Sequence, residues 1–270
     1  MPRDTKTPRT RAERPAAIDY PSYLHLDELL SLQQPVSHPE HPDELLFIVV
    51  HQASELWFKV ILHELETLMH RLEAADVLGA VFAVQRINAL VRIVTDQLSA
   101  LDTLPPQRFA EFRGLLGSSS GSQSAQFRAI EAAAGLRDPH FMHAIAEHGE
   151  PPAIVQQWLD RPTLQSLFER VLEQHRTTLE AIYADRTQSP LLMLAEALLE
   201  FEQGFARWRF LHVQLVERII GPATAGTGGT LGARYLQRTV NQRFFPKLWE
   251  VRAKFYGHSG QDEQAEGTRH

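Results

Sequence analysis

The spacing of the apolar residues constrains the fold of this chain more than any other feature. Over most of the sequence, apolar residues recur every three or four positions, which is the pattern of helices with one buried face. Alternating runs of the kind that form strands are scarce. The spacing predicts an all-α fold with helices over residues 24–33, 42–74, 78–103, 106–117, 123–135, 138–148, 151–159, 162–185, 190–221 and 230–255.

Local signals mark several of the predicted helix ends. Ser189-Pro190 is typical of an N-cap followed by a proline in the first turn, and Pro105-Pro106 interrupts the pattern between two helices. Thr230 follows two glycines and can cap the last helix. The body of the chain contains no internal repeat and no Ser/Gly linker, so we expect a single domain of long antiparallel helices. Its expected range is 18–256, between disordered tails at 1–17 and 257–270.

Composition excludes several kinds of site and partner. Of the 270 residues 43% are hydrophobic, which is ample for a core, and none is cysteine, so neither a disulfide nor a thiolate metal site can form. The net charge of −6 gives no electrostatic reason to expect nucleic acid or a membrane surface as a partner. The basic N-terminus lacks the apolar segment of a signal peptide, and we expect no apolar run of the ~18 residues that cross a membrane. These features favour a cytoplasmic protein.

Two histidines interrupt apolar helix faces. His51 lies within "DELLFIVVHQASELWFKVILHEL", and His212 interrupts a stripe on the helix predicted over 190–221. The face around His51 carries Phe47, Ser54, Glu55, Phe58 and Leu62, and the stripe around His212 carries Phe201, Phe205, Trp208, Leu215, Val216 and Ile219. Burying an unpartnered polar ring costs roughly 1–3 kcal/mol, so each histidine needs a partner, with Glu55 one candidate for His51.

These two histidines fit two interpretations. Lone histidines on apolar faces are often core residues bonded to a backbone carbonyl. Two of them among aromatic side chains also suit a flat apolar cofactor, because one imidazole can bind iron while a second polar group faces the open side.

Other metal motifs are weaker. "HELETLMH" (63–70) has the wrong spacing for a His-Glu-x-x-His zinc site, and no paired Glu-x-x-His motifs indicate a di-iron bundle. The three histidines of His140–His148 are more typical of a partly exposed helix face than of a metal site.

Several longer motifs point to one family. "LFIVVHQASELWFK" resembles the signature of the tryptophan 2,3-dioxygenases, which are haem enzymes that open the indole ring. Similar blocks occur in the family's order from about residue 18 to 255, so the resemblance covers nearly the whole chain. They are "YPSYLHLDELLSLQQPVS", "FAEFRGLLGSSSGSQSAQFRAIE", "RWRFLHVQLVERIIG", "GTGGTLGARYLQRT" and "RFFPKLWEVR".

The resemblance implies a fold, a cofactor and an activity. It implies that the helices enclose a pocket for haem b (iron protoporphyrin IX), where O2 opens the indole ring of L-tryptophan to give N-formyl-L-kynurenine. It also implies a homotetramer in which the N-terminal segment reaches the active site of a neighbouring subunit. Tyr20, Tyr23 and Leu24 would then contact the substrate of that neighbour.

The resemblance also assigns roles to individual residues. His212 would be the proximal iron ligand, and His51 would lie on the opposite side, near the indole N–H. Arg113 would bind the substrate carboxylate, because its planar guanidinium matches a carboxylate in two parallel hydrogen bonds. The remaining implied contacts are Phe47 at the indole, Phe109 near the carboxylate, Thr227 at the ammonium and carboxylate, and Ser120 and Gly121 against haem and substrate.

Three departures from the family pattern leave the outcome of the reaction open. Phe109 stands where some members have tyrosine, Ser122 stands where phenylalanine is usual, and the loop Gly221–Gly229 is one residue longer than usual. One alternative is therefore one-atom oxygenation of a tryptophan-like or tyrosine-like amino acid on the same haem scaffold. Another is a non-catalytic helical protein in which both histidines are ordinary core residues.

Overall fold

The computed structural model describes residues 19–137, 142–143, 150–185, 187, 189–222, 224, 236–237 and 239–256, with Ser122 described for its backbone alone. Within these residues the chain is all-α and has no strand, which confirms the predicted fold class. The longer helices are α3 (Glu44–Glu73), α4 (Val77–Asp96), α5 (Pro106–Arg113), α6 (Ala125–Ala134), α9 (Leu164–Gln174), α11 (Pro190–Ile220) and α13 (Pro246–Tyr256). The shorter ones are α1 (Tyr20–Leu24), α2 (Leu26–Ser31), α8 (Ala153–Leu159), α10 (Leu179–Ala184) and the 3-10 helices η1 (Gln97–Thr103), η2 (Gly114–Leu116) and η3 (Gly121–Gln123).

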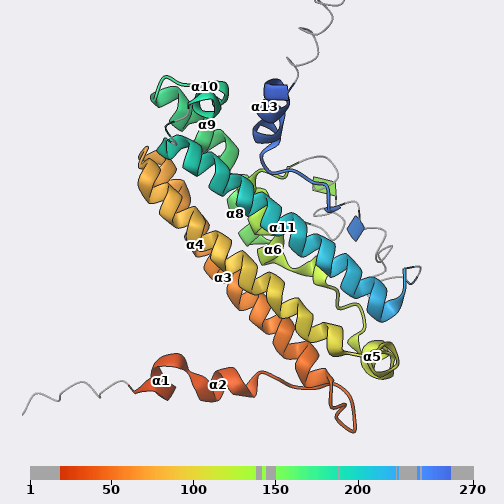
Figure 1. The fold of residues 1–270 in the computed structure, drawn as a ribbon. Helices are drawn as coiled ribbons and strands as arrows, with labels where there is room; N and C mark the ends of the chain where they lie inside the picture. Colours follow the sequence, from red (N-terminus) through yellow and green to blue (C-terminus); the bar gives the residue numbers. More distant parts are fainter. Residues whose placement is uncertain are drawn as a thin grey trace, which may run out of the picture.

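Three long helices form the body of the protein. α3, α4 and α11 lie side by side in Figure 1, and α4 continues directly into η1. The turn between α3 and α4 is short because Ala75 adopts a left-handed conformation (φ 53°) and the Asp76 side chain accepts the Gly79 N–H at 3.0 Å. This turn makes the two helices antiparallel.

The contact between α4 and α11 is close. A Cβ at Gly204 would lie 2.9 Å from Val91 Cγ1, so the backbone of α11 packs directly against the Val91 side chain of α4. Nearby, the buried Asn88 donates from Nδ2 to the carbonyl of Ala197 at 3.0 Å. The two helices are therefore fixed to each other by packing and by a buried hydrogen bond.

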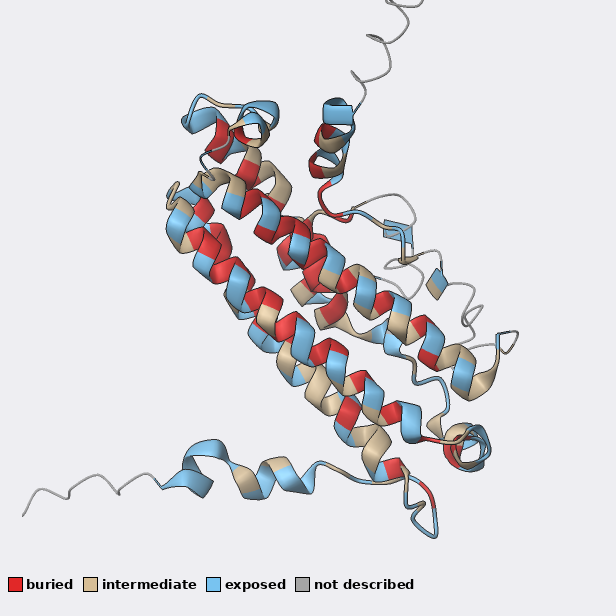
Figure 2. Ribbon diagram, in the orientation of Figure 1, coloured by how far each residue is buried: buried red, intermediate tan, exposed pale blue. Residues whose placement is uncertain are grey.

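The core follows this bundle. Buried residues line the facing sides of the long helices, as Figure 2 shows, and α6 packs against both α3 and α8. In contrast, α1 and α2 contain no buried residue and extend from one end of the bundle. The core thus belongs to the bundle, and two smaller apolar clusters lie towards the end near α5.

Several predicted helices are interrupted. The helix predicted over 24–33 corresponds to the shorter α2, and a separate helix, α1, precedes it and ends at His25 (φ 50°). The helix predicted over 162–185 is divided into α9 and α10 at Arg176 (φ 51°). The N–H groups of Phe244 and Phe245 bond to the Glu202 carboxylate, and α13 begins only at Pro246. Both predicted tails, Thr230 and most of the helix predicted over 138–148 lie outside the described residues.

Two helices contradict the expectation about apolar length. By length and composition alone, Glu44–Glu73 and Val77–Thr103 are each apolar enough to cross a membrane, with a mean hydropathy of 1.6. The expectation that no run reaches this length was therefore wrong. Both segments contribute buried residues to the bundle, and the apolar window is 56% buried in Val77–Thr103 and 22% buried in Glu44–Glu73.

Candidate functional site

A cavity of about 220 Å³ lies between α3, η1, α5, α6 and α11. Its walls are mainly apolar and aromatic, which is typical of sites for small molecules and cofactors. The structure brings seven of the predicted site residues together there: Phe47, His51, Phe109, Arg113, Ser120, Gly121 and His212.

His51 comes from α3 and has a defined tautomer. Its Nδ1 lies 2.7 Å from the Phe47 carbonyl oxygen, and because a carbonyl only accepts, Nδ1 carries the proton. The neutral ring therefore keeps Nε2 as an acceptor. The side chain is exposed because solvent can enter the cavity that it lines. The surrounding protein still lowers the pKa of His51 by desolvation, against the opposing effects of the Phe47 bond and the Glu55 charge.

His212 comes from α11 and faces the same cavity. Its ring stacks on that of Trp208, with centroids 5.0 Å apart and planes 20° from parallel. Burial is the main cause that lowers the pKa of His212 to about 4, and repulsion from a protonated His51 adds to it. At neutral pH the imidazole is therefore uncharged and has an unshared electron pair, as a metal ligand requires.

The helix α5 supplies an aromatic wall and a cation. Phe109 and Arg113 are one turn apart and so lie on the same face of α5. The Phe47 ring lies 5.4 Å from the ring of Phe109 and 5.8 Å from that of Phe112, measured between centroids. A planar apolar group entering the cavity would meet aromatic rings on this side and the Arg113 guanidinium beside them.

The segment before α6 leaves open space. Ser120 and Gly121 line the cavity, and a Cβ built at Gly121 would meet no atom within 4 Å. Ser124 then caps α6 by accepting the Phe127 N–H at 3.1 Å. The chain therefore passes the cavity with small side chains before the helix begins.

Other sequence predictions are placed differently. Glu55 is not the partner of His51: its carboxylate and its carbonyl oxygen each accept from Gln126 Nε2 at 2.8 Å, which joins α3 to α6. Tyr20, Tyr23 and Leu24 lie on α1, are exposed, and do not line the cavity of their own chain. Thr227 lies outside the described residues.

The sequence analysis missed part of the aromatic lining. Phe127 packs against Trp208 with ring centroids 4.8 Å apart, and Phe58 contacts both rings. Trp208 could be predicted from the sequence, because it lies on the same apolar stripe as His212, one turn earlier. Nothing in the sequence indicated that Phe127 of α6 would reach the same place, because this depends on how α6 packs on α3.

A buried ion-pair group next to His212 was also missed. Glu131 accepts from Arg209 at 2.6 Å and from Arg128 at 2.7 Å, and all three residues border a small cavity shared with His212. Glu131 and Arg209 are almost completely buried, so the pair compensates two charges that could not be buried singly.

The donor set indicates what kind of metal centre could form here. Among the described residues, no group of three or more His, Asp or Glu side chains is arranged to hold a metal ion. The apolar walls, the neutral imidazole and the open space at Gly121 are compatible with a flat porphyrin.

Comparisons with known proteins agree with this geometry. The family model described as tryptophan 2,3-dioxygenase matches residues 3–148 and 144–255. Proteins named tryptophan 2,3-dioxygenase from Kineococcus radiotolerans and Herpetosiphon aurantiacus are 40% and 41% identical to the chain, each over 88% of its length and over 91% and 98% of their own. One of the same name from Bacillus anthracis is 39% identical over 88% of this chain and 92% of its own length. The chain therefore belongs to the tryptophan 2,3-dioxygenase family.

Proposed function

We propose that this protein is a haem-dependent dioxygenase that uses O2 to open the indole ring of L-tryptophan, giving N-formyl-L-kynurenine. The observation that carries the proposal is that His51 of α3 and His212 of α11 line one aromatic cavity. The family and the names of relatives at about 40% identity support the same reaction.

His212 is the residue that would hold the iron of haem b. Its low pKa keeps the imidazole neutral, and the apolar side chains Leu215, Val216 and Ile219 on the following turns of α11 suit a porphyrin face. Ser120 and Gly121 leave room for the ring to approach the backbone. When bound, haem supplies the iron that activates O2.

The other residues of the cavity would hold the substrate. Arg113 would bind the carboxylate in two parallel hydrogen bonds, while Phe47 and Phe109 pack against the indole. His51 Nε2 would accept the indole N–H and so orient the ring, because its other nitrogen is already committed to Phe47. Indole N–H is a very weak acid, so His51 acts by orientation rather than as an obligatory base. Thr227 would contact the ammonium and carboxylate groups.

The resemblance to the family also suggests an assembly and a location. We propose a homotetramer in which Tyr20, Tyr23 and Leu24 complete the site of a neighbouring subunit. Their exposure, and their position away from the cavity of their own chain, support this exchange. We further propose one domain over residues 18–256 between the tails 1–17 and 257–270, in a cytoplasmic protein without nucleic-acid or membrane partners.

Turnover with labelled oxygen tests the reaction. The protein is loaded with haem, reduced, and given L-tryptophan and ¹⁸O₂, and the product is examined by absorbance and mass spectrometry. We expect N-formylkynurenine with two labelled atoms. A product with one labelled atom would instead support one-atom oxygenation, which the names of the relatives do not favour. Protein that acquires no haem absorption band after haem addition would support the non-catalytic alternative.

Substitutions of the two histidines test their roles separately. His212→Ala should abolish stable haem binding, whereas His51→Ala should keep the haem spectrum and slow tryptophan turnover. His175→Ala is a matched control, because His175 also bonds through Nδ1 to the carbonyl four residues earlier but does not line the cavity. A normal ferrous spectrum in His212→Ala would refute the ligand assignment.

A further inference from the structure

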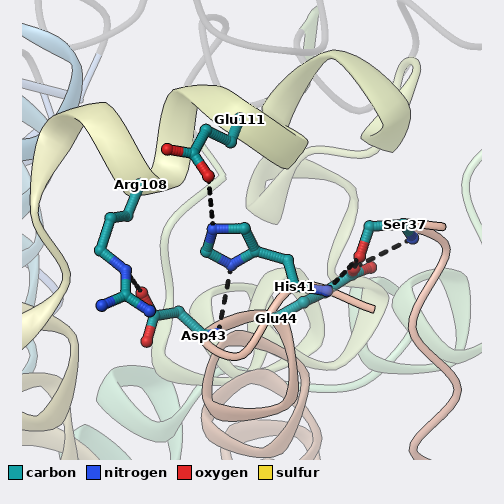
Figure 3. Close-up of polar contacts among 6 residues, drawn as sticks. All are labelled: Ser37, His41, Asp43, Glu44, Arg108 and Glu111. Atoms are coloured by element: carbon teal, nitrogen blue, oxygen red, sulfur yellow. Dashed lines mark hydrogen bonds and ion pairs between the residues drawn. The ribbon is translucent and has the colours of Figure 1, made fainter. Parts of the chain in front are cut away.

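Four polar side chains join the start of α3 to α5 (Figure 3). His41 Nε2 lies 3.0 Å from Glu111 Oε2, and Arg108 Nε lies 2.5 Å from Asp43 Oδ2 in an ion pair. We call these residues, His41, Asp43, Arg108 and Glu111, the α3–α5 clamp. None of them lines the cavity, and the function proposed above gives none of them a role.

His41 is held in one orientation and one tautomer. The Asp43 N–H donates to Nδ1 at 3.2 Å, so in the neutral ring the proton must be on Nε2, from which it is donated to Glu111. The His41 backbone N–H donates to Ser37 Oγ at 2.7 Å, and the ring packs on Phe112 with centroids 5.1 Å apart. Ser37 in turn contacts the buried Glu44 carboxylate at the first residue of α3. The ring is therefore a fixed donor at the start of α3.

Helix α5 depends on such a contact more than the other long helices do. Its buried residues Phe109 and Phe112 belong to a small apolar cluster with Leu104, separate from the main core. Phe47 of α3 and Ile219 and Ile220 of α11 pack against this cluster, but apolar attraction is non-directional and does not by itself fix the orientation of the helix. The clamp adds one directional hydrogen bond, between His41 and Glu111, and one ion pair, between Arg108 and Asp43, on the side of α5 that faces the start of α3.

The position of α5 matters because of what its inner face carries. Phe109 and Arg113 line the cavity, and across it stand Phe47 and His51 of α3. A shift of α5 relative to α3 would therefore change the distance between the guanidinium and the acceptor nitrogen of His51. That distance determines whether one molecule can satisfy both groups.

We propose that His41 and Glu111 are positioning residues that hold Arg113 at the correct distance from His51, and that they thereby set the affinity for substrates carrying an α-carboxylate. This inference rests on the proposed function of Arg113 and His51. Haem binding should not depend on the clamp, because the clamp is on the α5 side of the cavity and not on α11, which carries His212.

The main test compares two substitutions of Glu111, which is 63% exposed in its side chain and so can be changed with little risk to folding. In the haem-loaded enzyme, Glu111→Ala should raise KM for L-tryptophan about three- to tenfold, the effect of one lost hydrogen bond, and change kcat less than about twofold. Glu111→Gln keeps an oxygen that accepts from His41 Nε2 and should return KM to near the wild-type value. Arg108→Met, which removes the second contact of the clamp, should shift KM in the same direction.

Two controls separate positioning from general damage. Glu64→Ala removes the carboxylate of another polar pair of α3, which bonds to Arg86 at 3.1 Å, and should leave KM unchanged. A double-mutant cycle with Arg113→Met should be non-additive, because the clamp has nothing left to position once the guanidinium is gone. Haem content and thermal midpoint are measured for every variant.

The outcomes are distinct. If the wild-type enzyme turns over tryptophan but Glu111→Ala has an unchanged KM, the proposed role of the clamp is wrong and the proposed function is not affected. The same conclusion follows if Glu111→Gln raises KM as much as Glu111→Ala does. Additive effects of Glu111→Ala and Arg113→Met overturn the proposed role of the clamp as well. A wild-type protein that binds haem but does not turn over tryptophan defeats the proposed function instead.

Discussion

Around Glu202 the inner face of α11 is buried against the chain that leads into α13, whereas around His212, further along the same helix, that helix borders a cavity. The buried Glu202 carboxylate accepts the N–H groups of Phe244 and Phe245 at 2.6 and 2.7 Å and also bonds to Arg243 and Trp249. His212 has instead an aromatic stacking partner and an open space in front of it.

The two regions show how a residue that stabilises the fold differs from a residue that is available to bind a ligand. A buried polar group contributes to stability when its hydrogen bonds are made within the protein, as for Glu202. At His212 the protein lowers the pKa of the imidazole and surrounds it with apolar surface, which costs stability but keeps the nitrogen available. One helix can therefore serve both purposes at different points along its length.

Loss of the Glu202 carboxylate should have the largest effect on stability. Glu202→Ala leaves two buried backbone N–H groups without an acceptor, so we expect it to lower the free energy of unfolding of the apoprotein by about 3–5 kcal/mol. Urea denaturation measures this change. Glu200→Ala is the control, because its partner Arg92 and Glu200 itself are both mostly exposed. A loss below about 1 kcal/mol in Glu202→Ala would show that the buried region does not depend on this group.

The same substitution at the two regions should have unequal effects. Phe201 is fully buried among Phe205 and Phe244, so Phe201→Leu should cost about 1–3 kcal/mol of stability and leave KM unchanged. Phe47 borders the cavity, so Phe47→Leu should cost less than about 1 kcal/mol but raise KM for tryptophan. Denaturation and steady-state kinetics on both variants give the comparison. Equal losses of stability would contradict it.

The pH dependence should reveal the accepting nitrogen of His51. Burial holds the pKa of His51 below the usual value of 6.5. Above this lowered pKa, Nε2 is unprotonated and can accept the indole N–H. As the pH falls through the pKa, Nε2 becomes protonated and can no longer accept this bond. The acid limb of kcat/KM for tryptophan should therefore lie below pH 6.5, with a loss of about three- to tenfold for one hydrogen bond. His51→Gln offers an oxygen that does not titrate in this range, and should lack this limb. An unchanged limb in that variant would assign it to another group.

The smallest expected effect concerns Phe109. Phe109→Tyr adds a hydroxyl beside Arg113, and we expect KM for tryptophan to fall about twofold to tenfold through one additional hydrogen bond to the carboxylate. Tryptamine, which has no carboxylate, should bind equally well to both proteins in a spectral titration. A fall in KM accompanied by tighter tryptamine binding would mean that the hydroxyl acts elsewhere.

Much of the fold was predictable because strong local signals coincide with long periodic segments. The predicted helices 42–74 and 190–221 match α3 and α11 closely, and the second has a cap at Ser189 and a positive φ at Gly221. The division of 162–185 at Arg176 was not predicted, because arginine is an ordinary residue within helices. The Thr178 side chain, which caps α10, was the available signal.

The candidate site was predictable to the extent that its residues carry recognisable motifs. His51 and His212 stood out because each interrupts an apolar face, but their common cavity depends on the packing of α3 against α6 and α11. Glu131 and Arg209 are far apart in the sequence, so only the tertiary structure pairs them. The α3–α5 clamp was missed for the same reason, since the segment "HPEHPDE" lies far from Arg108 and Glu111 in the sequence and nothing in it indicates that His41 contacts them.

The bare backbone at Gly204 has a consequence for the distant end of its helix. Eight residues separate it from His212, a length of about 12 Å along the axis, and η1, which continues α4, forms part of the opposite wall. The distance between α11 and η1 across the cavity therefore depends partly on the absence of a side chain at position 204. Alanine at position 204 would push α11 away from α4 at Val91, so we expect Gly204→Ala to change the affinity for the proposed haem without replacing any residue that lines the cavity.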